Sequence, residues 1–180
     1  MTDLIQFSRY GMTLKKLESN DIEMVRQWRN DPKIASQMLD QTYITSEMQK
    51  QWFEKIQSSP HHYCFVACFK GDAIGFCSVT RRKEQNDAEV GLYIYDDRYR
   101  GNIVPFCLAF ALLDFCFESL NCAGLFARVL NTNTQAIRFN AACGYKVDHA
   151  INTDLTRYTL NDADYLSSRN KMSRFIRYES

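Results

Sequence analysis

This sequence has little proline and glycine, the residues that most often mark turns, loops and linkers. Three prolines and seven glycines are spread over 180 residues, without clustering into a linker or a low-complexity tract. No internal repeat divides the chain either. We therefore expect residues 1–180 to form a single domain, which is long enough to bury a substantial core.

An excess of one charge is also lacking. The 22 lysines and arginines almost balance the 21 acidic residues, so the formal net charge is +1. That balance favours neither a nucleic-acid partner nor an acidic membrane surface. The most apolar run, 103–117, is too short to span a bilayer and contains Asp114. The chain begins Met1-Thr2-Asp3-Leu4, without the basic and apolar regions of a signal peptide.

The cysteines do not form a recognisable framework. There are seven of them, and no two have Cys-x-x-Cys spacing. An odd number without such spacing favours free thiols in a reducing compartment, so we expect a cytoplasmic protein. Cys143 is interpreted as a small buried residue. His61 and His62 are adjacent without a third ligand nearby, and we expect no metal site.

Strand and helix patterns fill most of the chain. We expect strands at 12–17, 63–69, 74–80, 88–95, 124–130, 145–151 and 156–160, with a hairpin turn at Lys70-Gly71-Asp72. Capping boxes at Asn20/Glu23 and Ser46/Gln49 predict two early helices, and further helices are expected at 104–119 and 133–142. The segment from Asp162 fits either a strand or a helix. This mixed order predicts an α+β fold.

The functional prediction depends most on the stretch from Ala88 to Ser119. Its strand leads into a polar loop with two arginines, Arg98 and Arg100, and then into an apolar helix. We interpret Gly101 as the residue that a tight backbone path requires, and Pro105 suits the first helical turn. Backbone amides at a helix N-terminus, flanked by arginines, form an anion site. A phosphate-bearing cofactor is the expected ligand.

Two segments, in this order, resemble the GNAT superfamily of N-acetyltransferases. Tyr99–Pro105 is similar to the pyrophosphate loop of that family, and Asn133–Tyr145 is similar to its downstream helical segment. A third segment, Trp28-Arg29-Asn30-Asp31-Pro32, resembles a subset that includes acetyltransferases of amino-sugar nucleotides and of ribosomal-protein N-termini. The resemblance covers nearly the whole chain.

The resemblance implies a mixed, mostly antiparallel sheet with helices on both faces. It also implies a splay between strands 88–95 and 124–130, in which acetyl-CoA pairs with the first strand. The implied cofactor contacts are Tyr93, Ile94, Tyr95, Arg98, Arg100, Gly101, Asn102, Ile103, Val104, Asn133 and Asn140. The implied acceptor contacts are Arg29, Thr80, Arg81 and Tyr93, and Glu89 is at the position of the general base.

Each of these residues also has a structural interpretation. Asn133 could cap a helix as well as contact the cofactor, and Glu89 could be a solvated strand residue. Arg29 fits either a salt bridge or an anion clamp in the acceptor site.

The sequence departs from the family pattern at three positions. Ile103 and Pro105 replace glycines of the pyrophosphate loop, and Pro105 removes an amide donor. Asn140 replaces the usual tyrosine general acid, and an amide is no proton donor. A water held by Asn140, or a hydroxyl such as Tyr158, Tyr145 or Tyr93, would then protonate the leaving thiolate.

We therefore predict an acetyl-CoA-dependent N-acetyltransferase that acts on the amine of a nucleotide-linked amino sugar. One alternative acceptor is a protein N-terminus, such as that of a ribosomal protein. Another alternative is a catalytically impaired acetyl-CoA-binding module. The predicted partner is a small-molecule amine, with neither nucleic acid nor membrane involved, and the resemblance leaves a homodimer open.

Overall fold

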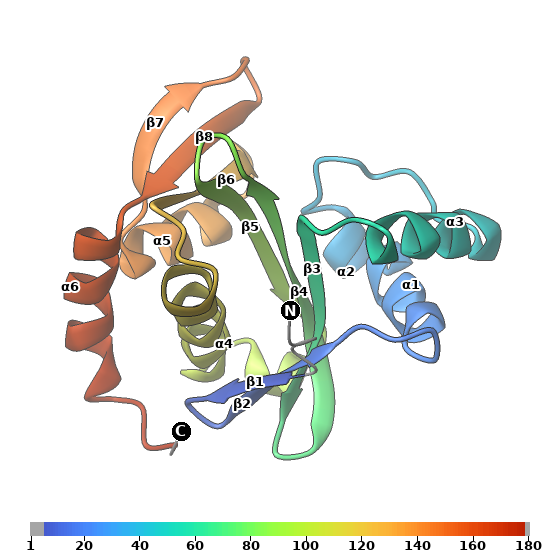
Figure 1. Cartoon of the computed structure of the whole chain (residues 1–180), viewed down its shortest axis with the longest axis horizontal. Coiled ribbons are helices and arrows are strands. Elements are labelled where there is room, and N and C mark those ends of the chain that lie inside the picture. Colours follow the sequence, from blue (N-terminus) through green and yellow to red (C-terminus); the bar gives the residue numbers. More distant parts are fainter. Residues whose placement is uncertain (1–5, 179–180) are drawn as a thin grey trace.

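A computed structural model describes residues 6–178, so the interpretation of Met1–Leu4 lies outside the described residues. One sheet contains eight strands in the order β1-β2-β3-β4-β5-β6-β8-β7 (Figure 1). The strands are β1 (Gln6–Arg9), β2 (Met12–Lys16), β3 (His62–Phe69), β4 (Asp72–Arg82), β5 (Asp87–Ile94), β6 (Gly124–Leu130), β7 (Lys146–Ala150) and β8 (Leu155–Leu160). The helices are α1 (Ile22–Asn30), α2 (Pro32–Ala35), α3 (Ser46–Gln57), α4 (Val104–Asp114), α5 (Thr134–Cys143) and α6 (Asp162–Ser173).

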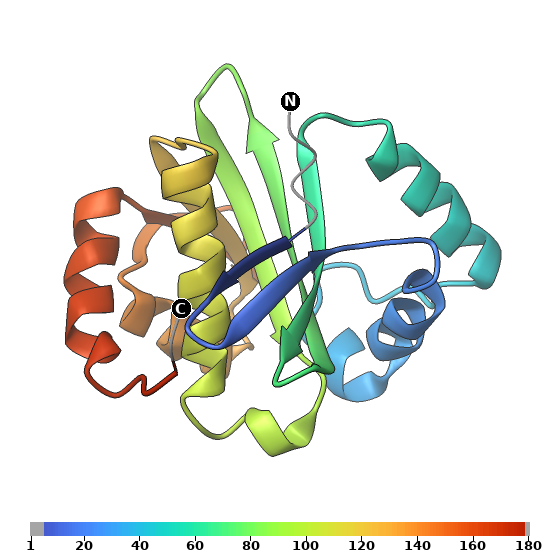
Figure 2. The same cartoon turned by 60° about the horizontal axis from the view of Figure 1, so that its bottom comes forward.

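The predicted α+β class is confirmed. Within the sheet, only β5 and β6 pair in parallel, and every other neighbouring pair is antiparallel. Helices α1 to α3 lie on one side of the sheet, and α4, α5 and α6 lie on the other (Figure 2). Each side has its own apolar cluster, one around Val25, Trp28 and Phe53 and one around α4.

The predicted splay is also confirmed. Strands β5 and β6 pair only where Asp87, Ala88 and Glu89 face Gly124, Leu125 and Phe126. Beyond Glu89, the remainder of β5 pairs with β4 alone. Since alternate residues of a strand turn their N–H and C=O groups to opposite sides, part of the β5 backbone faces an open edge.

Several local predictions were wrong. Helix α1 begins after Asp21, and the Asn20/Glu23 box does not form because the Glu23 carboxylate accepts a 2.6 Å hydrogen bond from Arg26. At α3 the cap is Thr45, whose hydroxyl accepts from the Met48 amide. Gln49 instead donates to the carbonyl of Ile22. In both boxes the predicted N3 side chain is engaged elsewhere, Glu23 with Arg26 and Gln49 with the Ile22 carbonyl.

Other predictions were confirmed or completed. Strands β3 and β4 are joined through Lys70-Gly71, both with positive φ, as the hairpin signal predicted. The segment from Asp162 is helical, and Asn161 caps it by accepting from the Asp164 amide. Strand β1 was not predicted; it joins β2 through Tyr10 and Gly11, which also have positive φ.

A buried carboxylate connects α4 to the sheet and to α6. Asp114 is 0% exposed and ends α4 where a π-helical turn, Phe115–Ser119, begins. It accepts hydrogen bonds from Arg9, Tyr10, Tyr165 and Arg169 at 2.6–2.8 Å. These bonds join the β1–β2 turn, α4 and α6, so they hold in place the helix whose N-terminus faces the splay.

Two further features concern the sequence predictions. No helix among residues 6–178 has the length and apolar character needed to cross a bilayer. All seven cysteines have free thiols. Burial raises the pKa of the Cys143 thiol to about 12, which fits its interpretation as a buried apolar residue.

Candidate active site

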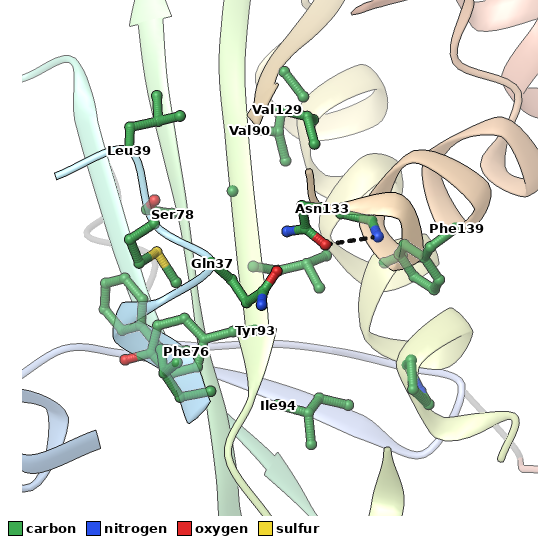
Figure 3. Close-up of a pocket in the computed structure, with 18 of the residues that line it drawn as sticks. Gln37, Leu39, Phe76, Ser78, Val90, Tyr93, Ile94, Val129, Asn133 and Phe139 are labelled. Carbon is green, nitrogen blue, oxygen red and sulfur yellow. Dashed lines mark hydrogen bonds between the residues drawn. The ribbon is translucent and has the colours of Figure 1, made fainter. Parts of the chain in front are cut away.

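A cavity of about 760 Å³ opens at the splay. One wall is formed by α1, the loop 36–45 and α3, and the other by α4, β6 and α5, with β4 and β5 between them. Figure 3 shows Phe76, Tyr93 and Leu39 on one side of β5, and Asn133 and Phe139 on the other. The cavity therefore has two sides separated by the open edge of β5.

The entry to α4 lies at one end of this cavity. The Val104 amide donates to Asn102 Oδ1 at 3.0 Å, and the Phe106 amide donates to the Ile103 carbonyl at 3.0 Å. Pro105 has no amide proton. The first-turn amides of the helix are thus engaged, contrary to the expectation that they point free into the site.

Backbone amides without a hydrogen bond lie just before α4 in the described chain. Within residues 6–178, the amides of Gly101, Asn102 and Ile103 donate no hydrogen bond. Three successive unpaired amides can bind an anion without help from the helix itself. The donors available to an anion here are therefore those of the loop 101–103 rather than those of the first turn of α4, and the anion-binding role of this loop stays a prediction.

Gly101 does not have the conformation that the sequence suggested. Its φ is not positive, and an added Cβ would meet no atom within 4 Å. The tight path through this loop is therefore no reason for glycine. Close approach of a ligand to this backbone, which a residue without a Cβ favours, stays a prediction.

The two arginines of the loop differ. Arg98 is 68% exposed at its side chain, pairs with Asp96 at 2.6 Å and does not line the cavity. Arg100 lines the cavity and makes a 3.2 Å pair with Asp97. Only Arg100 is thus positioned to meet a ligand in the cavity.

The remaining predicted cofactor residues fall into two groups. Ile94, Asn133 and Asn140 line the cavity. Asn133 also caps α5 by accepting from the Ala136 amide at 3.1 Å, so its capping role is confirmed and its cofactor contact stays a prediction. Tyr95 lies outside the cavity lining, because its hydroxyl donates to Asp31 and its ring stacks on Trp28. Gly101, Ile103 and Val104 are outside the lining as well.

The predicted base is bound to a cation. Both carboxylate oxygens of Glu89 accept from Arg128, at 2.6 and 3.1 Å. Arg128 lines the cavity, whereas Glu89 does not. The pair bridges β5 and β6 at the point where they separate, and the sequence did not indicate it because the two residues are 39 positions apart. The role of Glu89 as base stays a prediction.

The three candidate proton donors lie in different places. Tyr158 on β8 is in the core and outside the cavity lining. Tyr145 lines the cavity, but its ring is buried, which raises the pKa of its hydroxyl. Tyr93 lines the cavity, and its hydroxyl is buried without a hydrogen-bond partner.

Of the predicted acceptor residues, Arg29 and Tyr93 line the cavity. Thr80 and Arg81 do not; they lie on β4 opposite Glu89 and Ala88, where β5 is paired on both sides. Their acceptor contacts therefore stay predictions.

One wall of the cavity was not predicted from the sequence. The loop 36–45 contributes Gln37, Met38, Leu39, Asp40 and Ile44 to the cavity. Leu39 is 43% exposed. Several apolar residues in one loop were the available signal, although single exposed apolar residues are common.

The described residues contain no group of three potential metal ligands. The open edge of β5, the unpaired amides of 101–103 and Arg100 are instead groups that an extended ligand with an anionic part could bind. An extended chain can pair with an open strand edge, and successive amides bind phosphate.

The chain was compared with known proteins. The family described as acetyltransferase (GNAT) domain matches residues 12–146. The L-amino acid N-acetyltransferase AaaT of Escherichia coli K12 is 21% identical over 160 residues, covering 87% of this chain and 94% of that protein.

Solved structures agree in fold. An uncharacterized protein from Bacillus halodurans superposes with a TM-score of 0.82 at 13% identity and covers 91% of both chains. The spermidine N-acetyltransferase of Vibrio cholerae, solved with CoA and spermine, has a TM-score of 0.79 at 20% identity, covering 87% of this chain and 98% of that one. Since the family match spans most of the chain and the sheet splays where the family binds its cofactor, this protein belongs to the GNAT acetyltransferase family and uses acetyl-CoA.

Proposed function

We propose that this protein acetylates the primary amine of a small acceptor that carries a negative charge, and that residues 1–180 work as one domain. The observation that carries the proposal is the cavity at the splay, whose lining includes four cationic side chains, Arg29, Lys33, Arg100 and Arg128, and one acidic side chain, Asp40. Three of these cations pair with Asp97 or Glu89, so the lining attracts anionic ligands and disfavours polycations chiefly through Arg29.

Acetyl-CoA fits the side of the cavity next to α4 and α5. The free edge of β5 would pair with its extended arm, and the amides of 101–103 with Arg100 would hold its phosphates. It supplies the acetyl group as a thioester. Asn133 Nδ2 is free to donate as well, because the cap uses only Oδ1.

The chain's own residues would then assist the transfer. The amine nitrogen of the acceptor forms a bond to the acetyl carbon, and the carbon–sulfur bond breaks. A backbone amide of β5 would stabilise negative charge on the acetyl oxygen. The proton lost by the amine would leave through water or Glu89, and the thiolate would gain one from a water held by Asn140 or from a tyrosine. Holding both reactants in one cavity contributes up to about 7–11 kcal/mol in ideal cases.

The segment Trp28–Pro32 led to the prediction of a nucleotide-linked amino sugar. Much of this segment has a structural role. Trp28 stacks on Tyr95, Asn30 exchanges two 2.8 Å hydrogen bonds with the backbone of Ile44, and Asp31 caps α2. Arg29 is the member that lines the cavity. The segment therefore supports an acceptor with a negative charge, but it gives no specific support to a nucleotide.

The relatives act on different amines. AaaT is named for L-amino acids, and the Vibrio cholerae enzyme is named for spermidine. An amino acid fits the basic lining better than a polyamine, because a polyamine would meet Arg29 with like charge. Amino-sugar nucleotides and protein N-termini remain candidates.

The proposal is tested by CoA release from acetyl-CoA with panels of amino acids, nucleotide-linked amino sugars, peptides and polyamines. Turnover with an anionic amine supports it. If calorimetry shows CoA binding but no amine turns over, the protein is a binding module and the proposal is wrong. Light scattering under the same conditions tests whether the chain forms the homodimer that the resemblance leaves open, and cell fractionation tests the predicted cytoplasmic location.

A further inference from the structure

Two polar atoms in the cavity are buried without a partner. They are Nη1 of Arg29 and the hydroxyl oxygen of Tyr93. Among the described residues one other side-chain atom shares this state, Nε of Arg81, which lies outside the cavity. Leaving such groups unpaired in a folded protein is unfavourable, so a pair of them in one cavity needs an explanation.

The two groups line the same cavity, Arg29 from α1 and Tyr93 from β5. The positive charge of Arg29 opposes the effect of burial on the Tyr93 hydroxyl, although burial prevails and raises its pKa. Burial in turn lowers the pKa of Arg29. Tyr93 at neutral pH is therefore a neutral donor, and Arg29 is a charged donor in the same cavity.

Arg29 differs from the other cations of the lining. Lys33 and Arg100 both pair with Asp97, and Arg128 pairs with Glu89. The Nη2 atom of Arg29 donates to the backbone carbonyl of Asp40, and no carboxylate among residues 6–178 accepts from it. The charge of Asp40 favours the charged form of Arg29, but burial outweighs it. A half-buried guanidinium without a hydrogen-bonded carboxylate is costly, and an anionic ligand would lower that cost.

The surroundings of this donor pair are apolar. The rings of Trp52 and Phe76 lie 6.4 Å apart, and those of Phe76 and Tyr93 lie 5.8 Å apart, forming a row along the cavity wall. Figure 3 shows Phe76 and Tyr93 side by side, with Leu39 on the same side of β5. Leu39 and Met48 are each 43% exposed and complete this wall.

We infer that Arg29 Nη1 and the Tyr93 hydroxyl bind the carboxylate of the acceptor, and that the acceptor is an α-amino acid with an apolar side chain. This inference rests on the proposed acetyl transfer. A carboxylate has only acceptor atoms, so it matches two unpaired donors in one cavity. An apolar side chain matches the Trp52–Phe76 wall, where the hydroxyls of a nucleotide sugar would lose their hydrogen bonds to water.

The test compares amino acids with analogues that lack only the negative charge. L-leucine, L-methionine, L-phenylalanine and L-tryptophan are assayed beside their carboxamides, with nucleotide-linked amino sugars and spermidine as further acceptors. CoA release yields kcat/KM. For the wild type, at least one acid should exceed its amide by about tenfold or more, since a charge-assisted hydrogen bond is lost in the amide.

Two variants assign the effect to these side chains. Arg29→Gln and Tyr93→Phe should each lower kcat/KM for the acid by about tenfold to a hundredfold, mainly through KM, and leave the amide within about threefold. Tyr93→Phe should not lower Tm, because the removed hydroxyl has no partner. Tyr93→Phe therefore still tests the inference if Arg29→Gln folds poorly. Tyr43→Phe, on an exposed loop residue outside the cavity, should match the wild type on both substrates.

The possible failures are distinguishable. Equal rates for acid and amide in the wild type, or a preference for a sugar nucleotide or spermidine, would overturn the carboxylate subsite and leave acetyl transfer standing. An equal loss of kcat for acid and amide in Tyr93→Phe would make Tyr93 the proton donor and would also overturn it. Lack of turnover with every amine would overturn the proposed function and this inference together.

Discussion

Replacing Asp114 with asparagine should test how the fold holds the cofactor site. The side chain of Asp114 is fully buried, and two arginines and two tyrosines donate to it. Asp114→Asn removes the negative charge, and its NH₂ group would face other donors. Removing one partner of a buried ion pair typically destabilises by about 3–5 kcal/mol. Since domains have about 5–15 kcal/mol in total, the variant should fold with a small margin.

The charge of Asp114 also predicts how stability depends on pH. Burial alone would raise the pKa of this carboxyl, but the hydrogen bonds from Arg9, Tyr10 and Tyr165 and the charge of Arg169 outweigh it and lower the pKa. Because the folded pKa lies below the unfolded value of about 3.9, the stabilisation is present above that pH. It is lost as the pH falls through the folded pKa.

Urea unfolding at neutral pH and at several values below pH 5 measures both effects. Tyr165→Phe, which removes one 2.6 Å hydrogen bond to the carboxylate, should lose about 1.5–3 kcal/mol and serves if Asp114→Asn does not fold. Glu118→Gln is the matched control; its side chain is 47% exposed, so we expect a change within about 0.5 kcal/mol. A loss under about 1 kcal/mol in Asp114→Asn, or an acid-induced decline as steep as in the wild type, would refute the reasoning.

Three further predictions concern the cofactor side of the cavity. Gly101→Ala should keep Tm or raise it slightly but weaken CoA binding in calorimetry. Gly144→Ala should instead lower Tm, because Gly144 has a φ of 103° and an added Cβ would lie 2.8 Å from the Asp164 carbonyl oxygen. Unchanged CoA affinity in Gly101→Ala would mean that the ligand does not approach this backbone. Arg100→Ala should weaken CoA binding by about 1–3 kcal/mol, and equal affinities would remove Arg100 from the cofactor site. Asn140→Ala should lower kcat more than it raises the acceptor KM. Asn140→Tyr should keep kcat within roughly tenfold of the wild type. If Tyr158→Phe alone abolished turnover, Tyr158 would be the proton donor.

Apart from β1, α2 and the ambiguous segment from Asp162, the sequence by itself determined the element order and the loop before α4. These depend on local patterns: alternation in β5, a two-residue turn at Lys70-Gly71, and an apolar helix after a polar loop. The bounds of β6 matched the expected 124–130 because its apolar residues end at both sides. Family resemblance added the cofactor, which no local pattern specifies.

Only the tertiary structure decided which side chains meet. The Glu89–Arg128 pair joins residues 39 positions apart, and Asp114 accepts from residues on β1 and α6 that lie over 50 positions away in the chain. Sequence showed Asp114 only as an interruption in an apolar run. The same limit applied to Arg29 and Tyr93, since a missing hydrogen-bond partner is a property of everything packed around an atom. Local propensities act over a few residues, whereas a binding site depends on contacts that the folded chain brings together from distant positions.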